Sequence, residues 1–239
     1  MTDHDKKKKR VTIYTDGGCL GNPGPGDYGV VLLYGKHRKE LAAGYRLTTN
    51  NRMEVLAAVV ALETLTSPCH VDLHTDSKYL ITVAKSAARW QRNRWRRDPR
   101  KPQIAANVDL LERLLAASHR HQVTYYWVKG HADVKDNERC DELATQAAKK
   151  EAVLIDEAFE RAHPDITPPA AGDFEPPANL PKGKIKTVGQ PCRKCGCPVE
   201  KRVPKRQRKP GQSYYYEYYL ACPRCNTMYL VDAAKRMLD

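Results

Sequence analysis

Four carboxylates stand far apart along the first 141 residues, each inside a distinctive local sequence. They are Asp16 in YTDGG, Glu54 in TTNNRMEVLAA, Asp76 in HTDSKY and Asp141 in NERCDELA. Hard divalent cations such as Mg²⁺ prefer oxygen ligands. Two such ions can hold the attacking and the leaving oxygen of a phosphodiester during in-line displacement. The residue types therefore predict a metal site that acts on phosphodiesters, provided that the fold brings the four acids together.

The expected elements would bring them together at one edge of a sheet. Apolar alternation predicts strands, and helical spacing of apolar residues predicts helices. The expected strands are 11–15, 30–34, 41–47, 71–75 and 123–128, and the expected helices are 53–65, 77–88, 107–118 and 137–162. The Gly- and Pro-rich stretch 17–29 is expected to be an irregular loop. This order predicts an α/β fold, with a mixed sheet covered by helices.

Each acid is expected near the end of such an element. Asp16 and Asp76 follow predicted strands, and parallel strands would place both carboxylates at the same edge. Glu54 falls in the first turns of a helix that Thr49, Asn50 and Asn51 could cap. Asp141 falls early in the last helix, where an acid can simply complement the helix dipole. Loop capping and dipole effects explain single acids, but a metal site explains all four in one step.

The charge of the chain indicates a polyanionic partner. The formal net charge is +13 and the isoelectric point is near 9.4. Between Lys182 and Asp239 there are 14 Lys or Arg against 4 Asp or Glu, so this part carries +10. Such an excess favours nucleic acid as the partner, with an unspecialised basic surface as the alternative.

The sequence also predicts where the protein resides. It has no apolar run of the ~18 residues that a membrane helix needs. Residues 1–10 form a basic arm without the apolar core of a signal peptide. We therefore expect a cytoplasmic protein without membrane contact, associated with the nucleoid or, in a eukaryote, nuclear. The eight cysteines then indicate thiols or metal ligands before disulfides.

Four blocks carry a resemblance to a known family. TDGGCLGNPGPGDYG, TTNNRMEVLAAVVALE, HTDSKY and VKGHADVKDNERCDELA, in this order and spacing, resemble cellular type 1 ribonuclease H over roughly residues 10–150. The resemblance implies a ribonuclease H-like mixed five-stranded sheet and a monomer. It implies two Mg²⁺ ions, replaceable by Mn²⁺, bound by Asp16, Glu54, Asp76 and Asp141. It also implies hydrolysis of the RNA strand of an RNA–DNA hybrid, giving 5′-phosphate and 3′-hydroxyl ends.

The resemblance assigns further roles around the acids. His131, in the GHADVKDNE loop, matches a histidine that assists proton transfer or product release. Cys19, Asn22, Asn50 and Asn51 match positions that contact the nucleic acid, although turn and cap chemistry would also explain the asparagines. Further contacts are expected from Arg46, Thr49 and Lys78. Lys78 departs from the glutamine often found there, and lysine cannot accept a hydrogen bond.

A basic and aromatic segment from Arg89 to Lys101 contains seven Arg or Lys and one Asp. It matches the family's basic protrusion, which grips the hybrid outside the active site and would give salt-dependent affinity. A solvated basic face with tryptophans packed beneath it is the alternative. The candidate contacts are Arg89, Trp90, Arg92, Arg94, Trp95 and Arg96.

The C-terminal part indicates a separate module. Cys192 and Cys195 form one C-x₂-C pair, and Cys222 and Cys225 form a second after 26 intervening residues. This spacing predicts a zinc ribbon in which four thiolates hold structural Zn²⁺. Cys197 could replace Cys195 as a ligand. The expected organisation is a basic arm over 1–10, a catalytic domain over 11–162, a Pro-rich linker over 163–189 and the ribbon over 190–239.

Two questions of function stay open at this level. The basic, tyrosine-rich ribbon is expected to bind nucleic acid through cations and stacking, with protein docking as the alternative. For the whole chain, the leading hypothesis is an endoribonuclease that acts on RNA–DNA hybrids. The rival is a non-catalytic hybrid-binding protein, which the presence of all four acids disfavours.

Overall fold

The computed structural model describes residues 9–129, 134–148, 154–168, 180, 183–193, 196–204, 213–223 and 227–237. Within it the chain divides into two compact units. The first comprises Met1–Cys19 and Pro23–Pro168, and the second comprises Leu20–Asn22 and Pro169–Asp239. Each unit is described by itself below.

The first unit is built on one mixed sheet. Its strands are β1 (Lys9–Cys19), β2 (Gly24–Tyr34), β3 (His37–Thr48), β4 (Cys69–Thr75) and β5 (Gln122–Trp127). They lie in the order β3-β2-β1-β4-β5. The pairs β1–β2 and β2–β3 are antiparallel, whereas β1–β4 and β4–β5 are parallel. The mixed five-stranded sheet predicted from the sequence is therefore confirmed.

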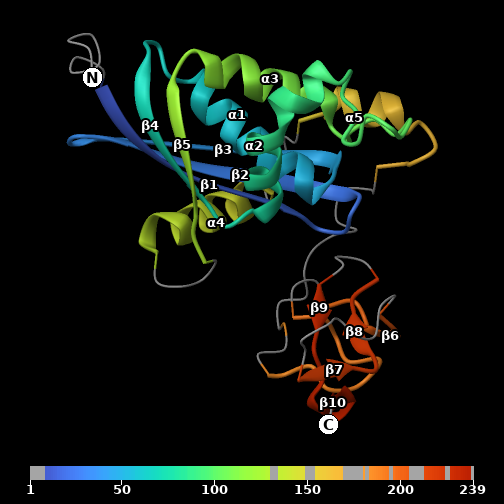
Figure 1. Cartoon of the computed structure of the whole chain (residues 1–239). Helices are drawn as coiled ribbons and strands as arrows, with labels where there is room; N and C mark the ends of the chain where they lie inside the picture. The colour runs from blue at the N-terminus through green and yellow to red at the C-terminus, as the bar shows by residue number, and fades with distance from the viewer. Residues whose placement is uncertain are drawn as a thin grey trace. The chain divides into compact units, whose positions relative to one another are not determined.

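Helices cover both faces of this sheet (Figure 1). They are α1 (Asn50–Glu63), α2 (Lys78–Arg92), α3 (Val108–His119), α4 (Lys135–Ala148) and the short α5 (Glu157–Ala162). α1 packs on β1 and β2 with α2 and α3 beside it, whereas α4 packs on β1, β2 and β3 from the other side.

The core lies between the sheet and the α1–α3 layer. Alternate residues of β1 and β4 point into it, so Ile13 and Leu73 are fully buried. α1 is apolar on most of its circumference, and Leu62 is fully buried on it, as is Leu111 on α3. Each such side chain contributes about 1.5–3 kcal/mol when it leaves water. α1, which carries Glu54, is therefore held firmly against the sheet.

Two sequence predictions about the first unit are wrong. The stretch 17–29 is not an irregular loop, because β1 continues to Cys19 and β2 begins at Gly24. The glycines in these strands let α1 and α4 approach the sheet closely. From composition alone, the same glycines indicated a loop. The single helix expected over 137–162 is two helices, because Leu154 bonds to the backbone of β3 and the buried side chain of Asp156 caps α5.

The second unit has a much smaller core. Its strands are β6 (Glu200–Arg202), β7 (Tyr214–Tyr216), β8 (Tyr219–Ala221), β9 (Met228–Tyr229) and β10 (Lys235–Met237), with a 3₁₀ turn η2 (Asp232–Ala234). Sheets β6-β8-β9 and β10-β7 surround a cluster that includes Leu220, Val231 and two cysteines. Ile185, placed in the linker by the sequence analysis, is buried in this cluster. The expected linker therefore extends too far toward the ribbon.

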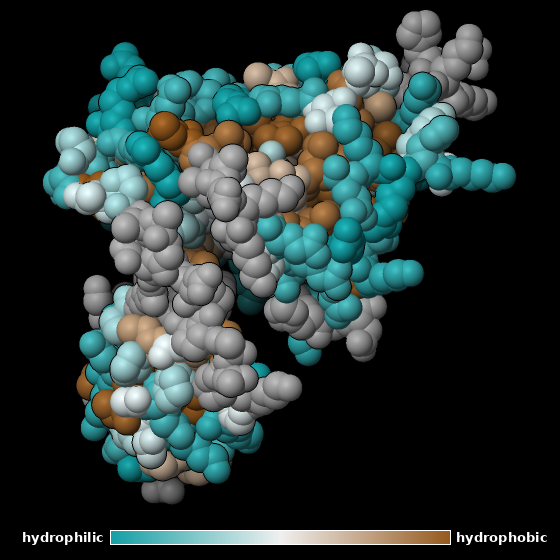
Figure 2. Space-filling model, turned by 180° about the vertical axis from the view of Figure 1, so that it is seen from behind, coloured by the Kyte–Doolittle hydropathy of each residue, from teal (hydrophilic) through white to brown (hydrophobic). Residues whose placement is uncertain are grey.

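Figure 2 shows where apolar residues reach the surface on one face of the protein. Apolar residues (brown) gather in one area of the larger unit there, among hydrophilic residues (teal). In the part of the chain that the structure describes, no helix combines the length and apolar character needed to cross a membrane.

Candidate active site

Asp16 and Asp76 each follow one of two paired threonines on neighbouring parallel strands. Thr15 of β1 pairs with Thr75 of β4, so the residue that follows each threonine is one of the two acids. β4 ends at Thr75, while β1 continues past Asp16. The Asp16 carboxylate accepts the Gly17 N–H at 2.8 Å. The sheet register thus brings these two acids to one edge, as the sequence predicts.

Glu54 reaches the same edge from the first turns of α1. A Cβ atom on Gly17 would collide with the backbone at Met53 and Glu54, so the helix passes directly over the residue after Asp16. The Glu54 carboxylate accepts Asn50 Nδ2 at 2.8 Å and also accepts the Ser77 hydroxyl. Because Ser77 follows Asp76, this second bond ties Glu54 to the end of β4.

The segment of α4 that carries Asp141 is brought close to the β1–β2 ladder at Asp16 by the packing of α4 on β2. Gly29 of β2 pairs with Asp16, and the Cys140 backbone lies against Gly29. Burial raises the pKa of the Cys140 thiol, and the negative charge of Asp16 raises it further. Asp141 is exposed in the second turn of α4, directly after Cys140. The four acid-bearing segments therefore meet at one edge of the sheet.

The acids line this edge and do not form a closed cage. Within the described ranges, no three His, Cys, Asp or Glu side chains stand close enough together to hold a metal ion by themselves. Mg²⁺ usually keeps several waters and takes one or two carboxylates together with phosphate oxygens. An open row of oxygen donors suits this ion better than it suits a metal that needs a full set of protein ligands.

The polar residues at the start of α1 differ in exposure and in hydrogen bonding. Asn51 is exposed, whereas Asn50 donates to Glu54. Thr49 occupies the N-cap position but makes no side-chain cap hydrogen bond. The expectation that these three residues cap the helix with their side chains is therefore wrong for Thr49, and Asn50 instead orients the acid one turn later.

The remaining expected contacts near the acids vary in accessibility. Asn22 is exposed in the turn between β1 and β2, but Cys19 is buried, with its thiol directed at the carbonyls of Gly24 and Thr48. The Cys19 thiol is therefore directed into the protein and not toward the surface. Lys78 is exposed, with its ammonium 5.4 Å from the centre of the Trp127 ring.

Two other expected site residues need separate mention. Arg46 of β3 forms a bidentate pair with Glu160 of α5, at 2.9 and 2.6 Å, so a phosphate would have to compete with that carboxylate. His131 lies outside the described residues.

The basic segment after α2 presents arginines above packed tryptophans. Trp90 is only 5% exposed, and Trp95 packs partly against the core. The exposed cations of this segment are Arg89, Arg92, Arg94, Arg97, Arg100 and Lys101. Among the described residues, Arg89, Arg92, Arg94 and Arg96 have no ion-pair partner. The arginines are therefore available to phosphates, while Trp90 is a buried anchor and not the contact predicted from the sequence.

The described cysteines of the second unit sit in two matching turns. The Cys192 N–H bonds to the Cys197 carbonyl at 2.8 Å, and the Cys222 N–H bonds to the Thr227 carbonyl at 2.9 Å. Both cysteines are fully buried, and the Cys192 sulfur lies 3.1 Å from the Tyr229 hydroxyl. The predicted ligands Cys195 and Cys225 lie outside the described residues. Both C-x₂-C pairs thus begin in the same local geometry.

Sequence reasoning missed two residues that organise the acid edge. Ser77 both binds Glu54 and caps α2 by accepting the Leu80 N–H at 2.9 Å. Its place directly before a helical pattern is the usual signal of an N-cap. Gly29 was missed because its role depends on α4, which lies more than 100 residues later in the chain.

Comparison with known proteins identifies the family of the first unit. The RNase H family model matches residues 8–149. A ribonuclease H of Syntrophus aciditrophicus is 56% identical over 154 residues, which cover 64% of this chain and 88% of that protein. A ribonuclease H of Desulforamulus reducens is 52% identical over 157 residues, which cover 65% of this chain and 98% of that protein.

A solved structure supports the fold as well. The crystal structure of LC9-RNase H1, described as a type 1 RNase H with the type 2 active-site motif, is 28% identical with a TM-score of 0.53, covering 65% of this chain and 81% of that one. The family match spans more than half of the chain, and the matched blocks contain all four acids. The chain therefore belongs to the ribonuclease H family of nucleases.

Proposed function

We propose that this enzyme is an endonuclease that hydrolyses the RNA strand of RNA–DNA hybrids and leaves 5′-phosphate and 3′-hydroxyl ends. The observation that carries the proposal is the meeting of four acid-bearing segments at one sheet edge, with Asp16 and Asp76 on paired parallel strands. Membership of the ribonuclease H family supplies the reaction class. A non-catalytic hybrid-binding protein would not need to keep these acids and to orient Glu54 through both Asn50 and Ser77.

The donor set at this edge suits Mg²⁺. Asp16, Glu54, Asp76 and Asp141 offer only carboxylate oxygens, the ligands that this ion prefers. When bound, a pair of such ions would activate water and stabilise the leaving oxygen. The protein's part is to fix the carboxylates: the Gly17 N–H holds Asp16, and Asn50 with Ser77 holds Glu54. His131 is proposed to assist proton transfer, and Mn²⁺ is expected to replace Mg²⁺.

Recognition of the hybrid is proposed to involve two surfaces. Asn50, which is bonded to Glu54, and the exposed Asn51 are proposed to contact 2′-hydroxyl groups, which distinguish RNA from DNA. The exposed Asn22 is proposed as a further contact. The arginines of the 89–101 segment would bind phosphates farther along the duplex. Cations that contact phosphate make binding weaken as salt rises.

The second unit is proposed to hold one structural Zn²⁺ through Cys192, Cys195, Cys222 and Cys225. The support is the matching backbone turn at Cys192 and Cys222 and the full burial of both side chains in a very small core. A core of this size needs an additional cross-link such as metal to be stable. Thiolate sulfur and tetrahedral geometry favour zinc.

We further propose that this unit helps to bind nucleic acid. Its cations lie beside tyrosine rings: Lys201 Nζ is 4.3 Å from the centre of the Tyr218 ring, and Lys235 Nζ is 4.1 Å from that of Tyr214. Basic residues next to aromatic rings are the usual features of a surface that binds strands by charge and stacking. A role in protein docking would leave hybrid affinity unchanged when the unit is removed.

The substrate proposal is tested with a panel of labelled duplexes. Wild-type enzyme with Mg²⁺ should cleave the RNA strand of an RNA–DNA hybrid, and should leave double-stranded RNA, single-stranded RNA and double-stranded DNA intact. Removal of residues 169–239 should then weaken hybrid binding and reduce its salt dependence without abolishing cleavage. Equal cleavage of double-stranded RNA, or cleavage of none of the four, would overturn the substrate proposal.

A further inference from the structure

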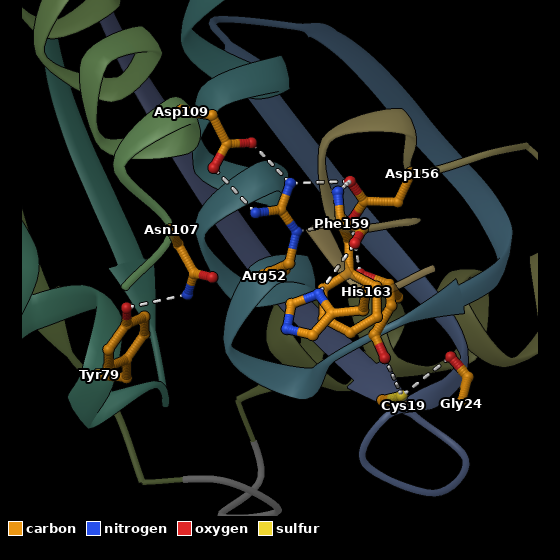
Figure 3. A network of polar contacts seen from close by, with 10 residues as sticks. Cys19, Gly24, Arg52, Tyr79, Asn107, Asp109, Asp156, Phe159 and His163 are labelled. Carbon is orange, nitrogen blue, oxygen red and sulfur yellow. Dashed lines mark hydrogen bonds and ion pairs between the residues drawn. The ribbon is translucent and has the colours of Figure 1, made fainter. Parts of the chain in front are cut away.

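A buried arginine joins two carboxylates behind the acid edge. Arg52 Nε and Nη2 donate to Asp156 at 2.7 Å each, and Arg52 Nη1 and Nη2 donate to Asp109 at 2.9 and 2.6 Å. The Arg52 and Asp156 side chains are 5% and 7% exposed. Figure 3 shows the guanidinium lying between the two carboxylates. Such a buried charge must keep its partners, because an unpaired one is strongly destabilising.

Asp156 also ties together segments that are distant in the sequence. Its carboxylate accepts the Thr48 hydroxyl at 2.7 Å and the Phe159 N–H at 3.3 Å. Just before it, the Leu154 N–H bonds to the Gly44 carbonyl at 2.8 Å. The segment from Leu154 to α5 is therefore docked on β3 and α1. It lies beyond residue 149, where the family match ends.

Arg52 holds the face of α1 that is turned away from the acids. Asn50 and Glu54 are four residues apart and share one face of the helix, where they are hydrogen-bonded to each other. Arg52 lies two positions from each, which corresponds to about 200° around the helix axis. Thr49 gives no side-chain cap. The first turn of α1 is therefore fixed from behind by the Arg52 pairs and not by a capping side chain.

We propose that Asp156 is a positioning residue for the active site, acting through Arg52 on the first turn of α1. The pair between Asp156 and Arg52 sets the rotation of this turn, and with it the direction in which Glu54 and Asn50 point. The inference rests on the proposed role of Glu54 as a metal ligand. It extends the functional part of the first unit beyond the family match to residue 156.

The test uses the full-length protein with Asp156→Asn. Asparagine keeps the size of the side chain but removes the charge that Arg52 needs. We expect the cleavage rate to fall about 10- to 100-fold, because a displacement of about 1 Å at an active site costs rates of this order. The Mg²⁺ concentration that gives half-maximal rate should rise, while hybrid affinity measured without divalent metal should change little.

Two further variants keep the test decisive. Glu63→Gln removes the surface pair with Arg113, which joins α1 and α3 at the other end of α1 (2.8 Å). It should leave the rate and the Mg²⁺ dependence at wild-type values. Thr48→Val removes one hydrogen bond to Asp156 and is a milder change, so it should shift both quantities in the same direction by less. If Asp156→Asn does not fold, Thr48→Val alone tests the inference.

The outcomes separate a positioning role from a structural one. A folded Asp156→Asn protein with a lower melting temperature but the wild-type rate and Mg²⁺ dependence would overturn the inference. Equal losses in Glu63→Gln would also overturn it, because they would show that any loosening of α1 has this effect. If the wild-type enzyme does not cleave the hybrid, the proposed function is wrong. This result differs from one in which wild type cleaves and Asp156→Asn behaves like it, which overturns only the inference on Asp156.

Discussion

Gly29 of β2 lies against the backbone of Cys140 in α4, and a Cβ atom on Gly29 would collide with the Cys140 carbonyl oxygen. Gly29 pairs with Asp16 across the β1–β2 ladder, and Cys140 precedes Asp141. A single hydrogen side chain therefore allows two of the four acids, 125 positions apart in the sequence, to approach one edge of the sheet.

Replacing this glycine should disturb both stability and activity. Gly29→Ala forces α4 away from the sheet, so we expect a loss of about 1–3 kcal/mol in unfolding free energy. Cleavage should slow as well, because Asp141 moves with α4. Gly183→Ala, where a Cβ would meet nothing within 4 Å, is the matched control and should leave both quantities unchanged. Urea unfolding and initial cleavage rates check the prediction, which an inert Gly29→Ala would refute.

Ser77 should affect folding and catalysis through two different bonds. Ser77→Ala removes the cap of α2, which should cost about 1 kcal/mol. It also frees one oxygen of Glu54, so the Mg²⁺ requirement for cleavage should rise. Thr82→Ala is the matched control, because it removes a hydroxyl on the same helix that donates to the Lys78 carbonyl. If both variants have the same Mg²⁺ dependence as wild type, Ser77 does not orient Glu54.

The sequence predicts those parts of the fold that depend on local pattern. The strands around Ile13 and Leu73 and the acids that follow them could be placed because alternation and strand ends are local features. Gly29 and Gly17 were assigned to a loop, since their role depends on helices that pack on them from elsewhere in the chain. Asp156 falls inside the helix expected over 137–162, and its role as a partner of Arg52 could not be predicted because Arg52 lies 104 positions earlier.

The pairing of Asp109 with Arg52 should be visible in the pH dependence of stability. Partial burial opposes ionisation of Asp109, but the hydrogen bonds and the charge of Arg52 outweigh it and hold the pKa below the ordinary value of 3.8. A lowered folded-state pKa contributes stability that is complete above about pH 4 and is lost as the pH falls through the folded-state value. The stability difference between wild type and Asp109→Asn should therefore be constant from pH 5 to 7 and shrink below pH 4.

Denaturant unfolding at each pH measures this difference. Asp165→Asn, the same change at an exposed aspartate, serves as the matched control for the substitution itself. If wild type keeps the same excess of unfolding free energy over Asp109→Asn at pH 3 as at pH 7, the Asp109 charge is not the source of that excess.

Metal analysis tests the cysteine site of the second unit. Purified full-length protein should contain one zinc per chain, and Cys192→Ser and Cys222→Ser should each lose it. Cys197→Ser is the matched control, since its side chain is only partly buried beside the same turn, and it should retain zinc. Zinc loss in Cys197→Ser with retention in a Cys195→Ser variant would assign the fourth ligand to Cys197. Metal-free wild-type protein with an intact second unit would refute a zinc site.

The most direct measurement is single-turnover cleavage of a labelled RNA–DNA hybrid by wild type and by Asp76→Asn, with hybrid binding measured in parallel. Asparagine at position 76 keeps the shape of the side chain but removes one anionic oxygen ligand from the acid edge. We predict that wild type cleaves the RNA strand with Mg²⁺, while Asp76→Asn binds the hybrid as well as wild type and cleaves it at least about 10³-fold more slowly. Cleavage by Asp76→Asn at the wild-type rate would contradict the assignment of these four acids as one catalytic site.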